Sequence, residues 1–473
     1  MLNKRTKIVA TISDEKCEQE FLRELHDAGV DVVRLNTAHQ NFEQSQKIIK
    51  NVRAVSERMA ILLDTKGPEI RTTVTAEPIE LKAGDTIKIK GAKSGKDSSR
   101  ALLYVNYARF VWDVPVGASI LIDDGELELV VKQKRANVLV CEAIDDGVIK
   151  SRKSVNLPGV SLHLPSLSPK DKEYILFAIE NNLDFIAHSF VRNKKDVLAI
   201  QKILDKHKSK IKIIAKIENK EGVDNIDEIL DHVYGVMVAR GDLSIEISTE
   251  EVPLVQKMLI KKCIARQKPI ITATQMLHSM INNPRPTRAE VSDVANAVMD
   301  GTDAIMLSGE TAYGMHPLKS VQMMSKIAMT IESQRQLPET LSFIEGPNKL
   351  VNYLARATVR IAEQTDAKEI IVNTDSASSA ELIAAYRGKV PVFAKCVDQQ
   401  RVRELALTYG VNAHVVQPMT AHQLLKQILS KLVKKGKLKQ SDLVIYLGSD
   451  LETKATANFM EICEVSKYVK EEK

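Results

Sequence analysis

A regular alternation of strand-like and helix-like segments limits the possible folds of this chain more than any other feature of its sequence. Each unit begins with a short run of apolar and β-branched residues and continues with an amphipathic stretch. The predicted strands lie at 7–13, 32–38, 60–66, 184–190, 211–218, 233–240, 269–275 and 303–309. Such alternation produces parallel sheets with right-handed crossovers, and eight units predict a (β/α)8 TIM barrel. The alternative, a doubly wound open sheet, lacks a G-x-G-x-x-G motif after the first strand.

The alternation stops in two places, and these breaks define the expected domains of an α/β protein. Between the third and fourth barrel strands, polar and apolar residues alternate around Asp-Gly and Gly-Asp turns, which predicts antiparallel strands. After the barrel, runs at 369–376, 390–396, 413–417 and 443–449 predict the strands of a small α/β domain. We therefore expect a barrel domain at 1–68 and 165–340, an inserted all-β lid domain at 69–164, itself a small β-barrel, and a C-terminal α/β domain at 341–473.

Composition places the chain among ordinary globular proteins and excludes several classes of function. It has 473 residues, of which 44% are hydrophobic and 27% charged, and a net charge of only +6. No apolar run approaches the ~18–20 residues of a membrane span, and the N-terminus has no signal-peptide pattern, so we expect a cytoplasmic protein without membrane contact. The five cysteines include no C-x-x-C pair, and aromatic residues are 4% of the chain. We therefore expect neither disulfides nor a zinc site, and no nucleic-acid partner.

Charged and polar residues gather where the predicted barrel strands end. In the stretch "IIAKIENKEG", Lys216 and Glu218 share one face of a strand because alternate side chains point the same way. Considered by themselves, these two residues could simply form an ion pair at the end of the strand. The same position on other strands holds Arg34, Asn36, His39, Asp64, Thr65, Lys66, His188, Ser189, Arg240, Gly241, Asp242, Thr272, Thr274, Ser308 and Glu310. Charges are rarely buried without partners, and barrel sites lie at the carboxyl ends of strands, so these residues predict a functional site.

The residue types at this site favour phosphoryl transfer assisted by a metal ion. Glu218 and Asp242 are hard carboxylates with no histidine or cysteine beside them, which favours Mg²⁺ over zinc. Lys216 and Arg34 supply two cations, and cations stabilise the charge that spreads over a phosphoryl group during transfer. The stretch "ARGD" leads out of a strand toward an expected capped helix, so the N–H groups of Gly241 and Asp242 are candidates for binding an anion.

The stretch "DTKGPEIR" leads from the third barrel strand directly into the inserted domain. Its glycine and proline are typical of a hinge, so we expect the inserted domain to close over the site as a lid. A closed lid would exclude water and prevent hydrolysis of an activated phosphate.

Several longer motifs closely resemble those of the pyruvate kinase family. They are "RLNTAH", "LLDTKGPEIRT", "VNLPG", "AKIENKEG", "VARGDL", "TATQML" and "PRPTRAEVSDVANAVMDGTDAIMLSGETAYGMHP". The resemblance runs from about residue 5 to the C-terminus. It implies the last step of glycolysis, in which the phosphoryl group of phosphoenolpyruvate passes to ADP and gives pyruvate and ATP. It also implies Mg²⁺ and K⁺ as cofactors, a regulatory C-terminal domain and a homotetramer.

The resemblance assigns roles to the residues around the transferred group. Lys216 would stabilise the phosphoryl group, and Glu218 and Asp242 would hold the Mg²⁺ that bridges to phosphoenolpyruvate. Gly241, Asp242 and Thr274 would bind the substrate, with Thr274 near the enolate carbon that must be protonated.

Further roles are implied around this centre. Arg34 would contact the phosphoryl group, and Ser189 would line the pocket. His39, Arg71 and Lys153 would bind the nucleotide, with Lys153 supplied from the lid.

The implied potassium site departs from the family pattern at one position. Asn36, Asp64 and Thr65 would coordinate the ion, and Glu69 matches the members of the family that depend on K⁺. The family usually has a serine ligand where this chain has Ala38. We expect K⁺ to bind more weakly, with water in place of the missing hydroxyl.

A second departure concerns regulation. Members activated by sugar bisphosphates carry a T-[KE]-S-G-[RK]-[ST] loop and a later loop rich in glycine and arginine. Here the first reads "TDSASS" at 374–379, and the second, "LGSDLETKATAN" at 447–458, is acidic at Asp450 and Glu452. Acidic groups repel a bisphosphate, so we expect no strong activation by fructose 1,6-bisphosphate.

Two other readings account for part of the sequence. The stretch "AKIENKEGVDNIDEIL" also resembles Mg²⁺-dependent barrel lyases that cleave citrate-like acyl-CoA thioesters, but that reading leaves the β insert and the C-terminal domain unexplained. A catalytically inactive scaffold is the third possibility, and the intact set Lys216, Glu218, Asp242 and Thr274 argues against it.

Overall fold

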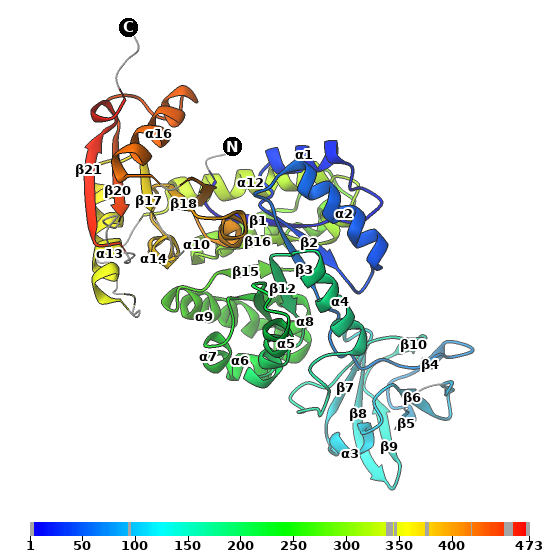
Figure 1. Cartoon of the computed structure of the whole chain (residues 1–473). Helices are drawn as coiled ribbons and strands as arrows, with labels where there is room; N and C mark the ends of the chain where they lie inside the picture. Colours follow the sequence, from blue (N-terminus) through cyan, green and yellow to red (C-terminus); the bar gives the residue numbers. More distant parts are fainter. Residues whose placement is uncertain are drawn as a thin grey trace.

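The computed structural model describes residues 4–92, 96–336, 344, 348–373, 378–417, 419–448 and 457–469. A central barrel lies between two smaller parts, which Figure 1 shows at opposite ends of the molecule. The lid strands lie at the lower right of that view, and the C-terminal sheet lies at the upper left. Among the described residues, no helix combines the length and the apolarity that crossing a membrane would need.

Eight parallel strands close the barrel in the order β1-β16-β15-β14-β13-β12-β3-β2, which confirms the predicted fold and excludes the open sheet. The strands are β1 (Lys7–Thr11), β2 (Val32–Asn36), β3 (Ala60–Asp64), β12 (Phe185–His188), β13 (Lys212–Ile217), β14 (Gly235–Ala239), β15 (Ile270–Ala273) and β16 (Ala304–Leu307). Each strand ends one or two residues before its predicted end. Most of the residues left over are polar, and they belong to the loops at the carboxyl mouth of the barrel.

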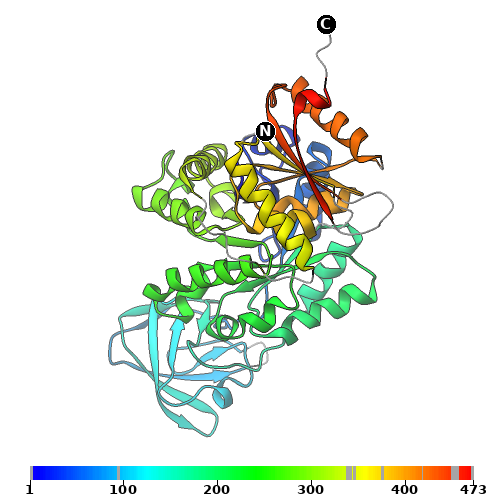
Figure 2. The same ribbon diagram turned by 90° about the vertical axis from the view of Figure 1, so that its left-hand side faces the viewer.

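Helices follow the strands and cover the outside of the barrel (Figures 1 and 2). They are α1 (Gln19–Asp27), α2 (Phe42–Val55), α4 (Pro169–Glu180), α5 (Lys194–Lys206), α6 (Lys220–Asp224), α7 (Ile226–Leu230), α8 (Arg240–Glu246), α9 (Val252–Ala265), α10 (Arg288–Asp300), α11 (Gly309–Ala312) and α12 (Pro317–Gln334). The N-cap predicted at Ser168 is confirmed, because its side chain accepts a hydrogen bond from the backbone N–H of Asp171. This satisfies a donor that the helix itself cannot pair.

The barrel interior fixes which strand residues face the site. A cluster contributed mainly by barrel strands includes Val32, Leu62, Ala187 and Ile214, all buried. Side chains two positions apart along a strand share a face, so the inward set continues to Arg34, Asp64, Ser189 and Lys216 at the mouth. These four residues therefore reach the site because the apolar residues before them fill the barrel core.

The insert between β3 and β12 forms its own core from short strands. They are β4 (Ile79–Leu81), β5 (Thr86–Gly91), β6 (Leu103–Val105), β7 (Ser119–Ile122), β8 (Leu127–Arg135), β9 (Val138–Ala143), β10 (Gly147–Ile149) and β11 (Val155–Asn156), with one short helix, α3 (Phe110–Asp113). Six of the strands form a sheet in the order β11-β7-β8-β9-β5-β6, and β10 pairs with β4. As expected, β7, β8 and β9 are antiparallel neighbours.

The C-terminal sheet has the order β19-β18-β17-β20-β21. Its elements are α13 (Lys349–Gln364), β17 (Glu369–Asn373), α14 (Ser378–Ala385), β18 (Val392–Cys396), α15 (Gln399–Glu404), β19 (Val411–Val415), α16 (Ala421–Lys434), β20 (Leu443–Gly448) and β21 (Phe459–Glu464). Helices α13 and α16 cover opposite faces of the sheet, as Figure 2 shows in yellow and orange. The four predicted strands are present, whereas β21 was not predicted, because this antiparallel edge strand is only partly buried.

A buried ion pair joins the C-terminal domain to the barrel, and it gives a prediction about stability. The guanidinium of Arg387 donates to Asp303 at 2.6 Å, and the two side chains are 5% and 3% exposed. Asp303 also accepts from the backbone N–H of Tyr409 and of Ile270. Arg387→Ala should lower stability by about 3–5 kcal/mol, because it leaves a buried carboxylate without its countercharge. Urea unfolding measures the loss, and exposed Arg285→Ala should have little effect.

Candidate functional site

Lys216 lies at the centre of the polar groups at the barrel mouth. Its Nζ is 2.8 Å from Ser189 Oγ, 2.9 Å from Glu218 Oε1 and 3.1 Å from Asp64 Oδ1. Burial opposes the charge of this ammonium, but the carboxylates of Asp64, Glu218 and Asp242 outweigh burial, so its pKa is raised. Lys216 is therefore a permanently charged cation. The side chains of Lys216 and Glu218 do point the same way, as the strand pattern predicted.

A second cation, Arg34, lies beside the first and shares its carboxylate partner. Arg34 Nε donates to Asp64 Oδ2 at 2.7 Å, and a terminal nitrogen donates to Thr11 Oγ1 at 3.0 Å. Burial would raise the pKa of Asp64, but Lys216 and Arg34 lower it further than burial raises it. One carboxylate thus fixes two cations side by side. Thr11, at the end of β1, is a site residue that the sequence analysis missed, because a threonine in a strand carries no distinctive signal.

Glu218 and Asp242 form a pair of neighbouring acids. Burial and the charge of Asp242 raise the pKa of Glu218 to about 7, against the opposing effect of Lys216. Burial also raises the pKa of Asp242, and the nearby carboxylates of Asp124 and Asp64 add to this rise. Glu218 Oε2 accepts from the backbone N–H of Phe190 at 2.6 Å, which fixes the orientation of the carboxylate.

These acids suit a hard divalent cation. Burial disfavours the charge of both carboxylates, so a positive ion beside them would stabilise their charged forms, and oxygen ligands are those that Mg²⁺ prefers. Among the residues that the structure describes, no group of three acid, histidine or cysteine side chains is arranged to hold a metal by itself. A metal at Glu218 and Asp242 would therefore need further ligands from substrate or water.

Thr274 reaches the site through an unusual backbone conformation. It follows β15 with φ of +69°, a value that β-branched residues rarely adopt. Its hydroxyl donates to Ala273 O at 2.7 Å and accepts from the backbone N–H of Gly241 at 2.8 Å. Arg240 holds this turn, since it donates to the carbonyls of both Ala273 and Thr274 and to Asp293. The hydrogen bonds from Arg240 thus hold Thr274 in its strained conformation, and such strain is typical of functional sites.

The loop after β14 differs from the expectation. The helix α8 starts at Arg240, immediately after the strand, and was not predicted. The expected helix, α9, begins only at Val252 and has no side-chain cap. Gly241 and Asp242 consequently lie in the first turn of α8, and the N–H of Gly241 is bonded to Thr274.

A cleft of about 590 Å³ separates the lid from the barrel mouth. It is lined by Arg71 and Asp124 from the lid and by Asp242 and Glu246 from the barrel. Asp124 has φ of +54° in the "DDG" turn. The sequence identified this segment as a hairpin turn, and the structure adds that its acid lies close enough to raise the pKa of Asp242.

Of the three residues predicted to bind the nucleotide, only Arg71 lies in the lining of this cleft. Arg71 lines the cleft and donates to Glu69 at 2.7 Å. Lys153 pairs with Asp123 at 2.6 Å within the lid, and His39 is exposed in the turn after β2. The structure does not bring His39 or Lys153 into the lining of this cleft.

The hinge into the lid is anchored to α4. Backbone N–H groups of Lys66 and Gly67 lie 3.1 and 3.4 Å from Asp171 Oδ1. Gly67 has φ of +73°, and a Cβ there would lie 2.8 Å from the Phe190 ring and from the Ser189 Cβ. Only glycine fits this position, so the chain leaves the barrel in a defined direction.

The residues proposed for K⁺ lie together at the ends of β2 and β3. Asn36 Oδ1 accepts from the backbone N–H of Ala38 at 3.2 Å, and Thr65 Oγ1 accepts from that of Ser189 at 3.1 Å. Ala38 itself is exposed and brings no oxygen from its side chain.

Some strand-end residues do not face the site, against the expectation. Ala273 and Ile271 belong to the barrel interior, so Thr272 points outward, where its hydroxyl donates to Thr302. His188 likewise follows the inward-facing Ala187 and lies on the outer face, and burial lowers its pKa to about 4.

Strand eight also contributes a structural acid. Glu310 accepts from the backbone N–H groups of Leu277 and Ser308 at 3.1 and 2.8 Å. It therefore fixes the loop after β15 and has no contact with the cations of the site.

The two loops predicted to weaken bisphosphate activation lie largely outside the described residues. Positions 374–377 and 449–456 are not described. The expectation of no strong activation by fructose 1,6-bisphosphate therefore stays a prediction.

Comparison with known proteins identifies the family. The family descriptions "Pyruvate kinase, barrel domain" and "Pyruvate kinase, alpha/beta domain" match residues 3–321 and 352–463. A pyruvate kinase of Borreliella burgdorferi is 45% identical over 99% of both chains. That of Geobacillus stearothermophilus is 43% identical over 98% of this chain and 81% of the relative. A crystal structure of a pyruvate kinase from Cryptosporidium parvum superposes with a TM-score of 0.93, at 36% identity, over 98% of this chain and 96% of that one. The chain belongs to the pyruvate kinase family.

Proposed function

We propose that this protein is a phosphotransferase that moves the phosphoryl group of phosphoenolpyruvate to ADP and produces pyruvate and ATP. The observation that carries this function is the arrangement of Lys216 and Arg34, which share Asp64 as a partner, beside the acid pair of Glu218 and Asp242. A coupled assay that follows pyruvate formation from phosphoenolpyruvate and ADP tests it. Cleavage of a citrate-like acyl-CoA thioester, with no turnover of phosphoenolpyruvate, would support the lyase reading instead.

Lys216 and Arg34 are proposed to neutralise the phosphoryl group as it moves. Negative charge spreads over its three peripheral oxygens in the transition state, so catalysis depends on cations fixed in advance. Asp64 and Ser189 hold Lys216 in place before substrate arrives. Fixed positions matter because the site then needs little reorganisation during transfer.

Glu218 and Asp242 are proposed to hold Mg²⁺. When bound, this ion would supply Lewis-acid stabilisation of phosphate oxygens. The chain contributes the orientation of both carboxylates, through the Phe190 N–H to Glu218 and through the first turn of α8 for Asp242. It also contributes the lid, which limits access of water.

The remaining substrate contacts are proposed at the turn after β15. Gly241, Asp242 and Thr274 are proposed to bind the carboxylate side of phosphoenolpyruvate, and the N–H of Gly241 would exchange its bond to the Thr274 hydroxyl for one to the substrate. Product formation needs one proton at the enolate carbon, and the Thr274 hydroxyl is the proposed group beside that carbon. The brace by Arg240 supports this role because it fixes Thr274 in a strained position.

We propose that residues 69–164 close as a lid when nucleotide binds. Arg71 already lines the cleft, while Lys153 is held by Asp123. Closure would allow Lys153 to exchange this partner for a phosphate, and His39 would approach from the barrel side.

K⁺ is proposed to bind Asn36, Asp64 and Thr65 with reduced affinity, and this gives a testable prediction. Ala38→Ser should lower the KCl concentration for half-maximal activity about fivefold, which corresponds to about 1 kcal/mol for one added oxygen ligand. A KCl titration of activity measures this change. Ala54→Ser, at an exposed position on α2, is the matched control and should not shift the titration. Full activity of the unmodified protein without K⁺ would contradict the proposal.

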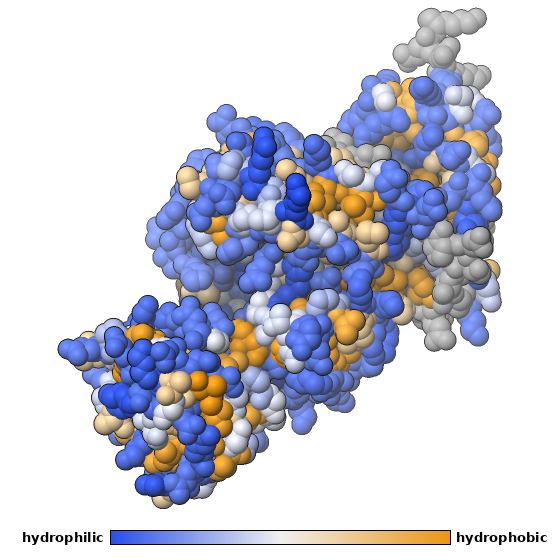
Figure 3. Space-filling view, turned by 180° about the vertical axis from the view of Figure 1, so that it is seen from behind, coloured by the Kyte–Doolittle hydropathy of each residue, from blue (hydrophilic) through white to orange (hydrophobic). Residues whose placement is uncertain are grey.

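We propose a homotetramer in solution. Large apolar side chains on the barrel are strongly exposed, among them Leu254 at 67%, Met299 at 60%, Tyr313 at 66% and Met315 at 67%. Figure 3 shows apolar patches interrupting the hydrophilic surface on one face of the molecule. Burial of such patches favours self-association. Sedimentation analysis tests this, and a monomer at all concentrations would contradict it.

A further inference from the structure

A large basic cavity lies between the amino-terminal end of the barrel and the C-terminal domain, far along the chain from the site residues. Its volume is about 650 Å³. Seven of its lining residues are lysine or arginine and one is acidic. The basic residues are Lys4, Arg5 and Arg58 from the barrel domain and Lys368, Lys431, Lys435 and Lys437 from the C-terminal domain. We refer to this feature as the interdomain cavity.

The positive charge of the interdomain cavity is poorly compensated on the C-terminal side. Lys4 and Arg5 have acidic partners, Asp31 at 2.8 Å and Glu332 at 3.5 Å. By contrast, no residue in the described part of the chain forms an ion pair or a side-chain hydrogen bond with the ammonium groups at 368, 431, 435 and 437. Like charges gathered without counterions repel each other, so such an arrangement favours the binding of an anion.

The remaining titratable groups of the cavity, Glu369 and His414, do little to offset this charge. Burial raises the pKa of Glu369 to about 8, with only Lys437 opposing it, so this carboxyl offsets the positive charge less than an ordinary glutamate would. Burial and the cations Arg58, Lys431, Lys435 and Lys437 lower the pKa of His414 to about 3. The neutral imidazole stacks on Phe393, with ring centroids 4.7 Å apart and planes 6° apart. The cavity thus combines a cationic rim with a flat, uncharged wall.

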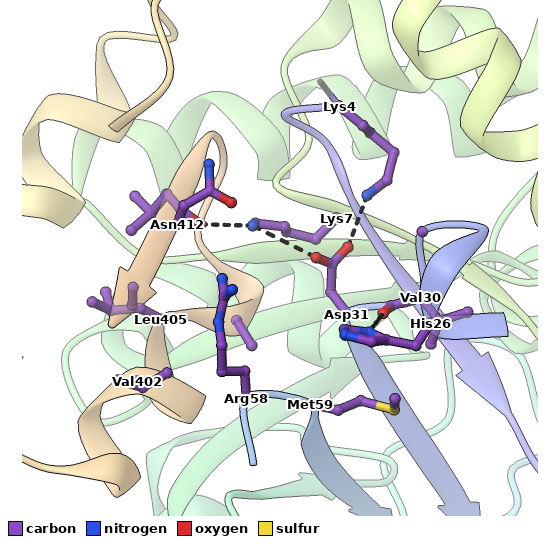
Figure 4. A pocket seen from close by; sticks show the side chains of 14 residues that line it. Lys4, Lys7, His26, Val30, Asp31, Arg58, Met59, Val402, Leu405 and Asn412 are labelled. Carbon is purple, nitrogen blue, oxygen red and sulfur yellow. Dashed lines mark hydrogen bonds and ion pairs between the residues drawn. The ribbon is translucent and has the colours of Figure 1, made fainter. Parts of the chain in front are cut away.

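A smaller neighbouring cavity provides an internal comparison. It has a volume of about 70 Å³ and shares Lys4 and Arg58 with the larger one. Figure 4 shows Lys4 and Lys7 pointing at Asp31, whose carboxylate lies 2.8 and 3.7 Å from their ammonium groups. Arg58 extends in the same view toward Asn412 of β19. The small cavity thus has one carboxylate beside its three cations, whereas the lysines on the C-terminal side of the interdomain cavity have no acidic ion-pair partner among the described residues.

We propose that the interdomain cavity is a binding site for a small molecule that carries phosphate groups. Its volume is typical of small-molecule sites, which span about 300–1,000 Å³. Lysine ammonium groups are common phosphate ligands, and the stacked pair of Phe393 and His414 offers a surface for the organic part of such a ligand.

Such a ligand would connect the C-terminal domain to strands that end at the active site. Arg58 lies just before β3, whose far end carries Asp64, and Arg5 lies just before β1, whose far end carries Thr11. A bound ligand would therefore link Arg5 and Arg58 of the barrel to the lysines of the C-terminal domain. It would favour the arrangement of the two domains in which these groups face one another. This adds an effector to the proposed function, but the binding itself does not depend on catalysis.

The binding test uses inorganic pyrophosphate as a probe in isothermal titration calorimetry on the full chain at low salt. Lys431→Ala/Lys435→Ala removes two ammonium groups from the cavity. Lys426→Ala/Lys434→Ala removes the same charge from the same helix at exposed positions outside the cavity lining. We expect the cavity variant to bind at least about tenfold more weakly at this site, because two charged donors to the phosphate oxygens are lost. The control variant should bind as the unmodified protein does.

Two further measurements distinguish binding in the interdomain cavity from binding in the active site. Lys216→Met should keep the cavity-dependent binding, because Lys216 lies at the other end of the barrel. The cavity variant should keep its basal activity, because neither lysine touches the proposed active site. Equal loss of binding in both lysine pairs would show that only general surface charge attracts the probe and would overturn the proposal. If Lys216→Met abolished all binding of pyrophosphate, the probe would bind only at the active site, and the proposal would be overturned as well.

Discussion

Lys216→Met should lower kcat by roughly 10³-fold or more, since a cation that stabilises a phosphoryl transition state contributes about 10³–10⁵-fold in comparable enzymes. The side chain keeps its length and loses only the ammonium that contacts Ser189, Glu218 and Asp64. If Lys216 acts mainly in the transition state, kcat and kcat/KM should fall together while KM changes little. Steady-state kinetics with both phosphoenolpyruvate and ADP varied measures these quantities.

The control for this experiment is Lys210→Met, which removes a charge just before the same strand at an exposed position. It should leave kcat within about twofold, because surface substitutions rarely matter. Lys216→Met also leaves Asp64 and Glu218 without one partner, so thermal unfolding must accompany the kinetics. Wild-type kcat in a folded Lys216→Met protein would exclude Lys216 as the cation of the reaction. It would also remove the main support for the proposed mechanism.

The barrel could be predicted from the sequence because its signals are local. Each strand is a continuous apolar run, and β13 also shows which face points inward: Ile214 enters the core, so Lys216 and Glu218 face the site. The same parity failed for Thr272, which faces outward although it was expected at the site. Alternation places Thr272 and Thr274 on one face of the strand, but only packing inside the barrel shows that this face points outward.

Other parts of the site depend on contacts between distant segments. Thr274 would point outward if β15 simply continued, but a positive φ and the hydrogen bonds from Arg240 turn it toward Gly241. Neither effect has a recognisable pattern in one sequence. The interdomain cavity is a similar case, because its cations come from positions 4 to 437 and meet only when the two domains pack together.

The second large effect is expected when Asp242, one acid of the pair proposed to hold Mg²⁺, is replaced. Asp242→Asn keeps the shape of the side chain and removes one of the two carboxylates proposed to hold Mg²⁺. Changing even the partners of metal ligands costs about 10–100-fold in affinity, so loss of a ligand charge should raise the Mg²⁺ concentration for half-maximal activity by about 100-fold or more. Titration of activity with Mg²⁺ at fixed substrate concentrations measures this. Asp224→Asn, which lies in the same cleft, is the matched control and should not shift the titration.

Without metal, Asp242→Asn should stabilise the folded protein. Burial raises the pKa of both acids, and like-charge repulsion from Asp242 raises the pKa of Glu218 further, so the folded state is destabilised when both are charged. Asp242→Asn removes that repulsion and should increase stability in EDTA by on the order of 1 kcal/mol, the free energy of one pKa unit. Thermal unfolding with and without Mg²⁺ checks both effects, because Mg²⁺ should stabilise the unmodified protein and not the variant. A variant that Mg²⁺ stabilises as strongly as the unmodified protein would place the ion elsewhere.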